Sequence, residues 1–502
     1  MIYLILFVIA SLICTLNIFS KNTKNKALIL RPPPGPKGLP FIGNLHQYDF
    51  SRPHEYLAKL AKTYGPIVSL QLGCAPMVVV QSARLAKEVM KTQDLNFCSR
   101  PPTTGIRKLS YNGLDIAFCP YNDYFREVKK ICVVHLFNSI RVRSFAPILQ
   151  DEIIRLMDKI TSLSSTSSTI DLSILVPDFA FANICRIAFG KSYEEDEGCG
   201  FEFQKILNEA ELMFIDMAYA DYFPSFGWLD KLTGKSARLE KTFRDLDAFN
   251  QKIIDDHLNP NKSHDNHRED IVDVLLQLRK ERSFAFDLTM DHVKAILMDV
   301  FIGGTDTSSG MIIWSMTELI KNPNAMKKVQ DELRKNVPPK ASYIYEHDLE
   351  TLEYFKAVVK ETFRLHPISP LLVAHQAIRQ TKIDGYNIEP GTIVQVNGWA
   401  IGRDPVSWTD PDKFMPERFL GSSIEFKGQD FELIPFGAGR RRCPAIHLGI
   451  VNFELTLANL LHFFDWKLPI GMNKEDVDTD TLPGIVMHKR NHLCLMANKF
   501  SY

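Results

Sequence analysis

The sequence lacks paired cysteines, a charge excess and internal repetition. Its nine cysteines are scattered and none has CxxC spacing, which argues against a zinc site or a disulfide framework and favours a reducing compartment. Acidic and basic residues balance at 59 each, so the charge gives no indication of a nucleic-acid partner. With 502 residues and no low-complexity tract, one large globular domain fits better than several.

The N-terminus is the exception to this ordinary composition. Residues from Ile2 to Phe19 are almost wholly apolar, and Lys21, Lys24 and Lys26 follow at once. A helix of that length spans about 27 Å, close to the hydrocarbon core of a bilayer. The pattern predicts a transmembrane anchor over 1–20, with the rest of the chain in the cytoplasm. A cleaved signal peptide is the alternative, but the segment lacks a basic start and a small-x-small cleavage site.

A basic, proline-rich segment follows the predicted anchor. Four prolines fall between Pro32 and Pro36, which excludes helix or central strand there and predicts a stiff connector over 21–45. Residues 46–502 then form the main domain. Helical periodicity dominates it, and strand signals cluster in two places. We expect a mainly α fold with small β-sheets: helices over 52–63, 83–91, 123–137, 146–162, 236–257 and 269–280, and strands over 67–72, 77–81, 382–388 and 392–397.

The stretch Phe436–Ala445, FGAGRRRCPA, is the most informative in the chain. Gly437 and Gly439 permit backbone with positive φ and close approach to a flat ligand. Nearby arginine charge favours the thiolate form of Cys443, and arginine suits bidentate pairing with carboxylates. This is the arrangement that a thiolate ligand of haem iron requires. The alternative is a basic surface loop with an incidental cysteine.

A second pattern lies in a predicted long helix from Thr289 to about Lys321. Its middle, from Gly303 to Ser308, carries two glycines and three hydroxyls, which lower helix propensity by roughly 1 kcal/mol for each glycine. Such residues permit a kink or a groove. A simple helix crossing that needs small residues is the alternative.

A further helix, 349–366, places Glu361 and Arg364 on one face, by default an ordinary surface pair.

These patterns together resemble the cytochrome P-450 family. The cysteine loop is similar to F-x-x-G-x-R-x-C-x-G, with Ala445 in place of the last glycine, and Gly303–Ser308 matches (A/G)-G-x-(D/E)-T-(T/S). Glu361 and Arg364 match the family's ExxR element, and Pro416–Phe419 its PERF element. The resemblance implies a single large haem domain of that fold, a haem b cofactor with Cys443 as iron ligand, and a buried structural triad of Glu361, Arg364 and Arg418.

The resemblance also implies further site residues. Thr307 and Asp306 would act catalytically, in oxygen activation and proton delivery. Haem contacts would come from Arg441 and Arg100, more weakly from Lys129 and His375, which replace arginines, and from Phe436 and Gly439; Phe125 replaces a tryptophan. We expect the substrate pocket to draw on 103–114, 208–218 and 369–373, and to include Phe301, Ile302, Gly303, Leu371, Leu372, Val373 and Ile485.

The implied function is a plant microsomal monooxygenase. It would insert one atom of dioxygen into a small apolar specialised metabolite, with electrons from NADPH through a reductase that meets Arg126, Lys130, Arg440 and Arg442. The implied location is the endoplasmic reticulum membrane. Two alternatives stay open: the same cofactor catalysing desaturation, ring formation or rearrangement, including aldoxime oxidation, or a haem-binding sensor or carrier without turnover.

Overall fold

The computed structural model describes residues 32–166, 169–191, 199–259, 269–282, 284–338 and 341–501. The predicted anchor, 1–20, lies outside these residues, as does most of the basic part of the predicted hinge. The described end of that hinge packs on the first strand of the fold. The backbone N–H of Ser69 donates to Pro34 O over 2.7 Å, and a Cβ on Gly35 would lie 1.9 Å from Ser69 O. This proline-rich segment is therefore fixed to the domain.

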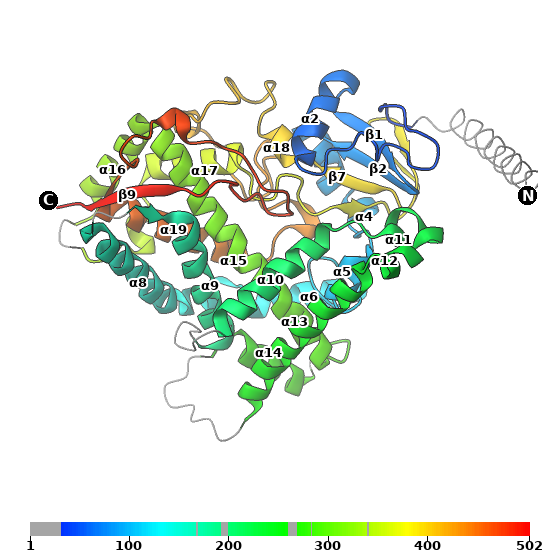
Figure 1. Cartoon of the computed structure of the whole chain (residues 1–502), viewed down its shortest axis with the longest axis horizontal. Helices are drawn as coiled ribbons and strands as arrows, with labels where there is room; N and C mark the ends of the chain where they lie inside the picture. The colour runs from blue at the N-terminus through cyan, green and yellow to red at the C-terminus, as the bar shows by residue number, and fades with distance from the viewer. Residues whose placement is uncertain are drawn as a thin grey trace, which may run out of the picture.

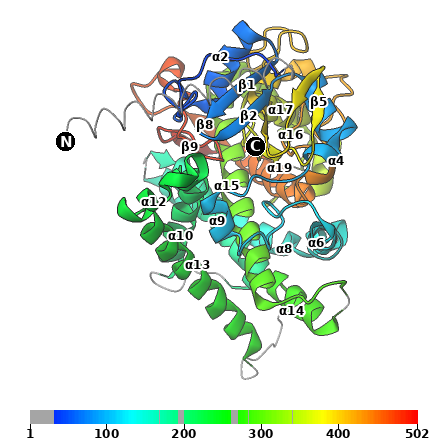
Figure 2. The same ribbon diagram turned by 90° about the vertical axis from the view of Figure 1, so that its right-hand side faces the viewer.

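The domain is built around one long helix, α15 (Met290–Lys321). It crosses the middle of the molecule in both views (Figure 1, Figure 2). Thr289 caps its start and Asn322 its end, as the sequence predicts. Pro323 then opens the next helix at a position where its missing N–H is tolerated. Most of α15 is buried against α9 (Leu172–Phe189), α17 (Glu353–Leu365) and α19 (Ile446–Phe463).

Further helices surround α15, and the prediction of a mainly helical fold with small sheets is confirmed. Two of the predicted helices end in π-helical turns, over Glu88–Thr92 and Ile131–Leu136. Two helices, α9 and α19, are apolar and long enough to cross a membrane, but both are mostly buried in the domain. The remaining longer helices are α2 (Pro53–Tyr64), α6 (Asp123–Lys130), α8 (Ala146–Ser165), α10 (Cys199–Ile215), α13 (Lys235–Leu258), α14 (Ile271–Glu281) and α16 (Pro323–Asn336).

The main sheet brings together strands that lie far apart in the sequence. The strands predicted over 67–72 and 77–81 pair as a hairpin around Gly73, with Ile67 opposite Val80. The second hairpin strand then runs parallel to a strand from the C-terminal half, with Met77 opposite Ile393. The order is β1 (Ile67–Leu72), β2 (Ala75–Val80), β7 (Ile393–Val396) and β4 (His375–Gln376).

The prediction of a single strand over 382–388 is wrong. This stretch is itself a hairpin of β5 (Thr381–Ile383) and β6 (Tyr386–Ile388), with Ile383 opposite Tyr386. Asp384 and Gly385 turn the chain with φ of 51° and 81°. An Asp-Gly pair is a strong hairpin signal because both residues tolerate positive φ, so the sequence contained the information for this turn.

A buried ion-pair network holds the irregular segment that leads to the cysteine loop. Both carboxylate oxygens of Glu361 accept hydrogen bonds from Arg364, over 2.7 and 2.8 Å, and both side chains are fully buried. Arg418 Nε adds a third contact at 3.1 Å. Arg364 also donates to the carbonyls of Gly402, Pro411 and Lys413. The structure thus brings together the three residues of the expected triad and ties them to the backbone.

Replacing Glu361 with Gln should destabilise the domain strongly, because two buried guanidinium groups then lose their counter-charge. We expect a loss of about 3–5 kcal/mol in the free energy of unfolding, measured by chemical denaturation. Glu353→Gln, at an exposed position in the first turn of the same helix, is the matched control. A loss from Glu361→Gln as small as that of the control would contradict the structural role of the triad.

Candidate active site

The cysteine loop is shaped by two glycines and by close packing on a neighbouring segment. Gly437 and Gly439 have φ of 67° and 64°, the region that favours glycine. A Cβ on Gly439 would lie 2.0 Å from the carbonyl oxygen of Met90. Gly439 therefore serves the contact between the loop and the segment around Met90, and it is not among the residues that line the neighbouring cavity. The prediction that Gly439 contacts the cofactor is therefore corrected, because this glycine faces Met90.

Cys443 lies three residues before the start of α19 at Ile446, and the N-terminus of a helix favours a negative charge. Its backbone N–H donates to Phe436 O over 3.0 Å, which closes the loop. Burial raises the pKa of the Cys443 thiol, while the N–H of Ala445 and the charges of Lys129 and Arg442 act in the opposite direction. The neighbouring positive charge acts in the direction that the sequence suggested, but burial outweighs it, so this charge does not by itself produce a thiolate. Coordination to a metal cation deprotonates a thiol outright.

The loop and the middle of α15 both line a cavity of about 320 Å³. This volume falls in the range of small-molecule sites. Most of the expected site residues lie on its walls. They are Phe436, Arg441 and Cys443 from the loop, Ile302, Gly303 and Thr307 from α15, Leu372, Val373 and His375 from the segment after α17, and Arg100, Lys129 and Ile485.

Two guanidinium groups at this cavity, the buried one of Arg100 and the half-buried one of Arg441, test whether an anionic cofactor fits. Arg100 donates only to backbone carbonyls, those of Ala117, Val373 and Ala374. Arg441 stacks on the Phe125 ring at 3.9 Å and donates to the carbonyls of Cys98, Ile116 and Cys119. Neither forms an ion pair within the described part of the chain. Burial, and then the charge of Arg441, lower the pKa of Arg100 to about 9.

Buried cations without an acidic partner are costly, and a ligand with carboxylates would supply the missing negative charge. The two propionates of haem have this chemistry, and the thiol of Cys443 lies on the same cavity. The residues present therefore fit haem. Phe125, where the sequence lacks the usual tryptophan, serves as the stacking face for Arg441.

Lys129 and His375 contribute differently from each other. Lys129 donates to Arg440 O at the cavity edge, and burial, then Arg442 and Arg441, lower its pKa to about 8, so it remains a cation at neutral pH. His375 is buried and its Nδ1 lies 3.1 Å from Phe97 O. Burial and the charge of Arg100 lower the pKa of His375 well below its ordinary value. The expectation that His375 replaces a cationic arginine therefore needs correction, because a neutral imidazole cannot pair with a carboxylate as a charge.

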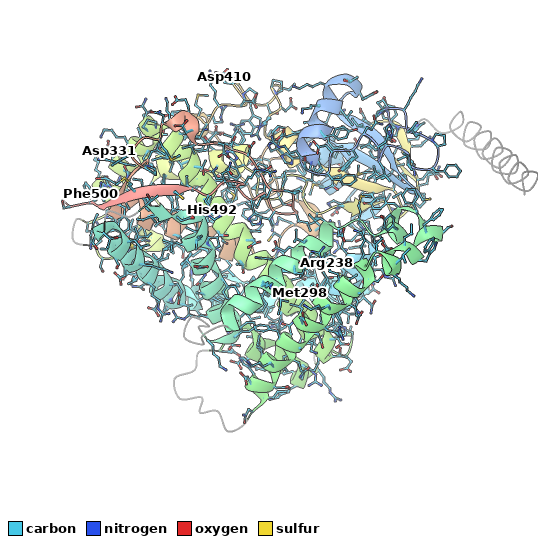
Figure 3. The ribbon with its side chains drawn as sticks, in the orientation of Figure 1. Arg238, Met298, Asp331, Asp410, His492 and Phe500 are labelled. Carbon is cyan, nitrogen blue, oxygen red and sulfur yellow. The ribbon has the colours of Figure 1, made fainter. Side chains whose placement is uncertain are left out.

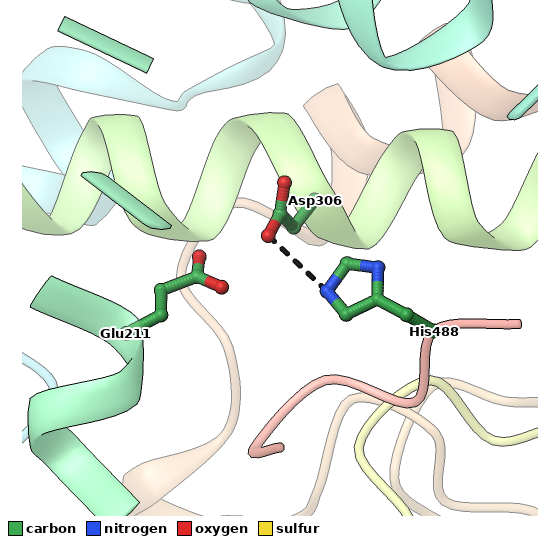
Figure 4. Close-up of side chains that lie close together, drawn as sticks. All are labelled: Glu211, Asp306 and His488. Atoms are coloured by element: carbon green, nitrogen blue, oxygen red, sulfur yellow. Dashed lines mark ion pairs between the residues drawn. The ribbon is translucent and has the colours of Figure 1, made fainter. Parts of the chain in front are cut away.

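The two expected catalytic residues of α15 point in different directions. Thr307 lines the cavity, and its hydroxyl donates to Gly303 O over 2.7 Å. Asp306 does not line the cavity. Its carboxylate lies 3.2 Å from Nε2 of His488 and faces Glu211 of α10 (Figure 4). Consecutive helical residues do not share a face, so any link from Asp306 to the cavity requires another group.

The expected pocket residues also need two corrections. Phe301 is fully buried and packs on Phe189 of α9, with ring centroids 4.3 Å apart; it faces the helical core and not the cavity. Leu371 packs in the cluster beneath the main sheet, while its neighbour Leu372 lines the cavity. Periodicity alone does not tell which of two adjacent apolar residues turns towards a cavity.

The expected contribution of 103–114 is replaced by the residues that follow it. Ile116, Ala117 and Phe118 line the cavity. The side chain of Asp299 on α15 holds this segment, because it accepts the N–H groups of Ile116 and Ala117 over 2.7 and 3.2 Å. Burial raises the pKa of Asp299 to about 7, against these hydrogen bonds. The acid therefore ties a loop wall of the cavity to the central helix.

Three polar residues around the cavity have no role that the sequence predicts. Glu211 and Ser369 lie within the predicted pocket segments 208–218 and 369–373, and His488 lies outside every predicted segment. Glu211 and Ser369 line the cavity, and the buried hydroxyl of Ser369 has no hydrogen-bond partner among the described residues. No local motif marks these positions, since their significance comes from the tertiary contacts they make.

Comparisons with known proteins agree with this geometry. The model of the cytochrome P450 family matches residues 33–496. The chain is 46% identical to "6,7,8-trihydroxycoumarin synthase" of Pastinaca sativa over 95% of either chain, and 45% identical to "5-OH-xanthotoxin synthase" of Ammi majus, covering 94% of this chain and 94% of that one. Among solved structures, a zebra fish cytochrome P450 with abiraterone matches with a TM-score of 0.75 and 25% identity, over 90% of this chain and 99% of that chain.

Replacing Cys443 with Ser should abolish the carbon monoxide spectrum characteristic of reduced, thiolate-ligated haem, because serine does not supply a thiolate. The matched control is Cys132→Ser, since Cys132 is buried and lines the same cavity. The spectrum should survive this control change. If Cys132→Ser loses the thiolate-type band and Cys443→Ser retains it, the iron ligand is Cys132 and the assignment of Cys443 is wrong.

Proposed function

This chain belongs to the cytochrome P450 family and is a haem-thiolate monooxygenase of plant specialised metabolism, and we propose that it hydroxylates a small, largely apolar aromatic metabolite. The observation that carries this proposal is the cavity between the cysteine loop and α15, whose walls join a free thiol, two unpaired guanidinium groups and an apolar chamber. Coumarin-type compounds are the first substrates to test, since the names of the two plant relatives specify such products.

In this proposal the part of the cavity next to the cysteine loop holds the cofactor. Cys443 would bind the iron, while Arg100, Arg441 and Lys129 would hold the propionates. Haem supplies dioxygen binding and oxygen-atom transfer when it is bound. The protein's part would be to deliver the protons that this reaction consumes, in a chamber that otherwise excludes water. Thr307 presents a hydroxyl on the α15 wall for this purpose, and Asp306 supplies protons from behind it.

The aromatic part of the cavity wall, formed by Phe118 and Phe214, favours an aromatic substrate. Phe118 and Phe214 lie with ring centroids 4.8 Å apart and nearly parallel planes, and aromatic rings prefer such offset stacking with further rings. Ile302, Val373 and Ile485 add aliphatic surface. The unpartnered hydroxyl of Ser369 offers one hydrogen bond that could orient an oxygenated ring.

We place the enzyme at the cytoplasmic face of the endoplasmic reticulum through the anchor expected over 1–20. Two exposed apolar groups support a lipid-facing surface: Leu39, Phe41 and Ile42, and Phe226, Trp228 and Leu232. They flank the same hairpin turn, where Gly73 N–H donates to Ile42 O and Cys74 N–H donates to Tyr222 O. Alkaline carbonate extraction tests this placement, since release of the full chain from microsomes would contradict a membrane-spanning anchor.

Electrons would come from NADPH through a reductase that meets a basic surface next to the cysteine loop. Arg126, Lys130, Arg440 and Arg442 are all exposed there, and a recess lined by Arg126, Lys130 and Arg440 also exposes Val133 and Val134. Arg440 pairs with Asp94 and Arg126 with Asp123, so Lys130 and Arg442 supply the less compensated charge. An acidic partner would be attracted to such a face.

The function is tested by screening aromatic plant metabolites, coumarin and xanthotoxin among them, for shifts of the Soret band, followed by turnover under heavy dioxygen. We expect the product to carry one heavy oxygen atom. A screen in which only aliphatic compounds shift the band would contradict the aromatic substrate class. A product without the label would favour desaturation, ring formation or rearrangement instead.

Reductase docking is tested by the rate at which NADPH and reductase reduce the carbon monoxide-trapped enzyme. Raising salt from about 0.05 to 0.5 M shortens the screening length roughly threefold, and we expect the rate to fall several-fold. Lys130→Glu should slow reduction at low salt. Lys241→Glu is an exposed control, since Lys241 lies on α13, the helix that carries Arg238 (Figure 3). Equal effects of the two substitutions would remove the case for this docking face.

A further inference from the structure

Three titratable side chains meet beside the cavity, from elements that are far apart in the sequence. Glu211 comes from α10, Asp306 from α15 and His488 from the C-terminal segment before β9 (Cys494–Lys499) (Figure 4). One ligand atom from each lies within 4.8 Å of the other two. The Asp306 carboxylate lies 3.2 Å from His488 Nε2.

The three side chains run from the cavity wall to the protein surface. Glu211 lines the cavity. The side chain of Asp306 is 16% exposed and that of His488 is 35% exposed. Asp306 therefore sits between a group that faces the reaction chamber and a group that faces water.

The charges of the two acids differ although they are neighbours. Burial raises the pKa of Glu211 to about 10, and the negative charge of Asp306 adds to this. Burial acts in the same direction on Asp306, but hydrogen bonds with His488 and Glu211 outweigh it and lower the pKa of that carboxyl. At neutral pH Glu211 keeps its proton and Asp306 is a carboxylate. Two interacting acids whose environments separate their pKa values are a recurring arrangement in proton-transfer sites.

We propose that Glu211 and His488 are proton-relay residues that connect solvent to the distal cavity through Asp306. Glu211 gives its carboxyl proton to the chamber, a proton from His488 then passes through the Asp306 carboxylate to restore Glu211, and His488 takes up a new proton from water. No electron moves in these steps, and each proton consumed in the chamber is one proton taken from solvent. The inference rests on the proposed monooxygenase function, because that reaction consumes the protons.

The geometry favours a relay over an ordinary ion pair. An Asp–His pair alone would not require a protonated acid on the cavity wall, and Asp306 itself does not reach the cavity. Nearby charges from the C-terminal segment are satisfied elsewhere: Lys489 pairs with Asp478 at 3.2 Å, and Arg490 donates to Thr481 O. Among the described residues, Glu211 and His488 are thus the charged or titratable groups that face Asp306.

The relay is tested in the ligand-free holoenzyme reconstituted with reductase and NADPH. Reduction of dioxygen to water consumes twice as many protons as reduction to hydrogen peroxide, so a broken relay diverts electrons to peroxide. We expect Glu211→Gln and His488→Gln to raise the peroxide formed per NADPH about two- to fivefold. The rise is limited because water molecules replace part of the proton transfer that each substitution removes. Glu211→Asp, which keeps an ionisable carboxyl, should restore water production in part.

Matched controls are available on the same elements. Glu209→Gln removes an acid two residues earlier on α10 that pairs with Arg238. His492→Gln removes an imidazole of the C-terminal segment that pairs with Asp171 at 2.6 Å. Both should leave the peroxide yield unchanged. A rise in these controls equal to that in Glu211→Gln and His488→Gln would overturn the relay.

A second readout does not depend on turnover. The infrared difference spectrum between the wild-type protein and Glu211→Gln at neutral pH should contain the carbonyl band of a buried protonated carboxylic acid, shifted in heavy water, and the difference between the wild type and Glu209→Gln should lack it. Absence of this band from the Glu211→Gln difference spectrum would overturn the inference. So would a Glu211→Gln variant that changes only the dissociation constant for xanthotoxin, because Glu211 would then be a substrate contact. Failure of the proposed function itself is distinguishable, since it would appear as a wild-type product without heavy oxygen, whereas the relay is measured by the peroxide yield of the ligand-free enzyme and by the infrared band of Glu211.

Discussion

The buried contact between Glu361 and Arg364 is the interaction on which the rest of the site depends. Neither side chain is exposed, and removing one partner would leave an uncompensated charge in the core. Arg364 also donates to three backbone carbonyls between Gly402 and Lys413. A long irregular segment is therefore held in place without a helix or strand of its own, and that segment leads directly to the loop that carries Cys443.

The middle of α15 combines two demands that oppose each other. The helix must be rigid enough to form the core, and most of its residues are buried. It must also leave space for a ligand, which it does with glycines at 303 and 304. At Gly304 a Cβ would lie 2.6 Å from a methyl group of Ile184, while at Gly303 nothing lies within 4 Å. One glycine thus permits helix packing and the other leaves the cavity open, at a cost of roughly 1 kcal/mol each in helix propensity.

Charge is separated across the cavity. Arg100, Arg441 and Lys129 surround the part next to the cysteine loop, whereas Glu211, Asp299 and Asp306 lie along or behind the α15 and α10 walls. Among the described residues the cations have no acidic partner, while the acids are connected to N–H groups or to each other. This division is the basis on which we propose cofactor binding for one set of side chains and proton transfer for the other, in one apolar chamber.

The sequence alone determined the features whose information is local. The order of glycine, arginine and cysteine in 436–445, the glycine–hydroxyl run in α15 and the spacing of Glu361 and Arg364 each belong to one short segment, and the mainly helical fold follows from periodicity. Only the tertiary structure decided which neighbour of a pair faces the cavity, as with Phe301 and Ile302, and which charge a buried group keeps, as with His375 and Glu211. The meeting of Glu211, Asp306 and His488 depends on three distant elements packing together, and no periodicity or motif encodes such a contact, because burial and partner charges exist only once the chain has folded.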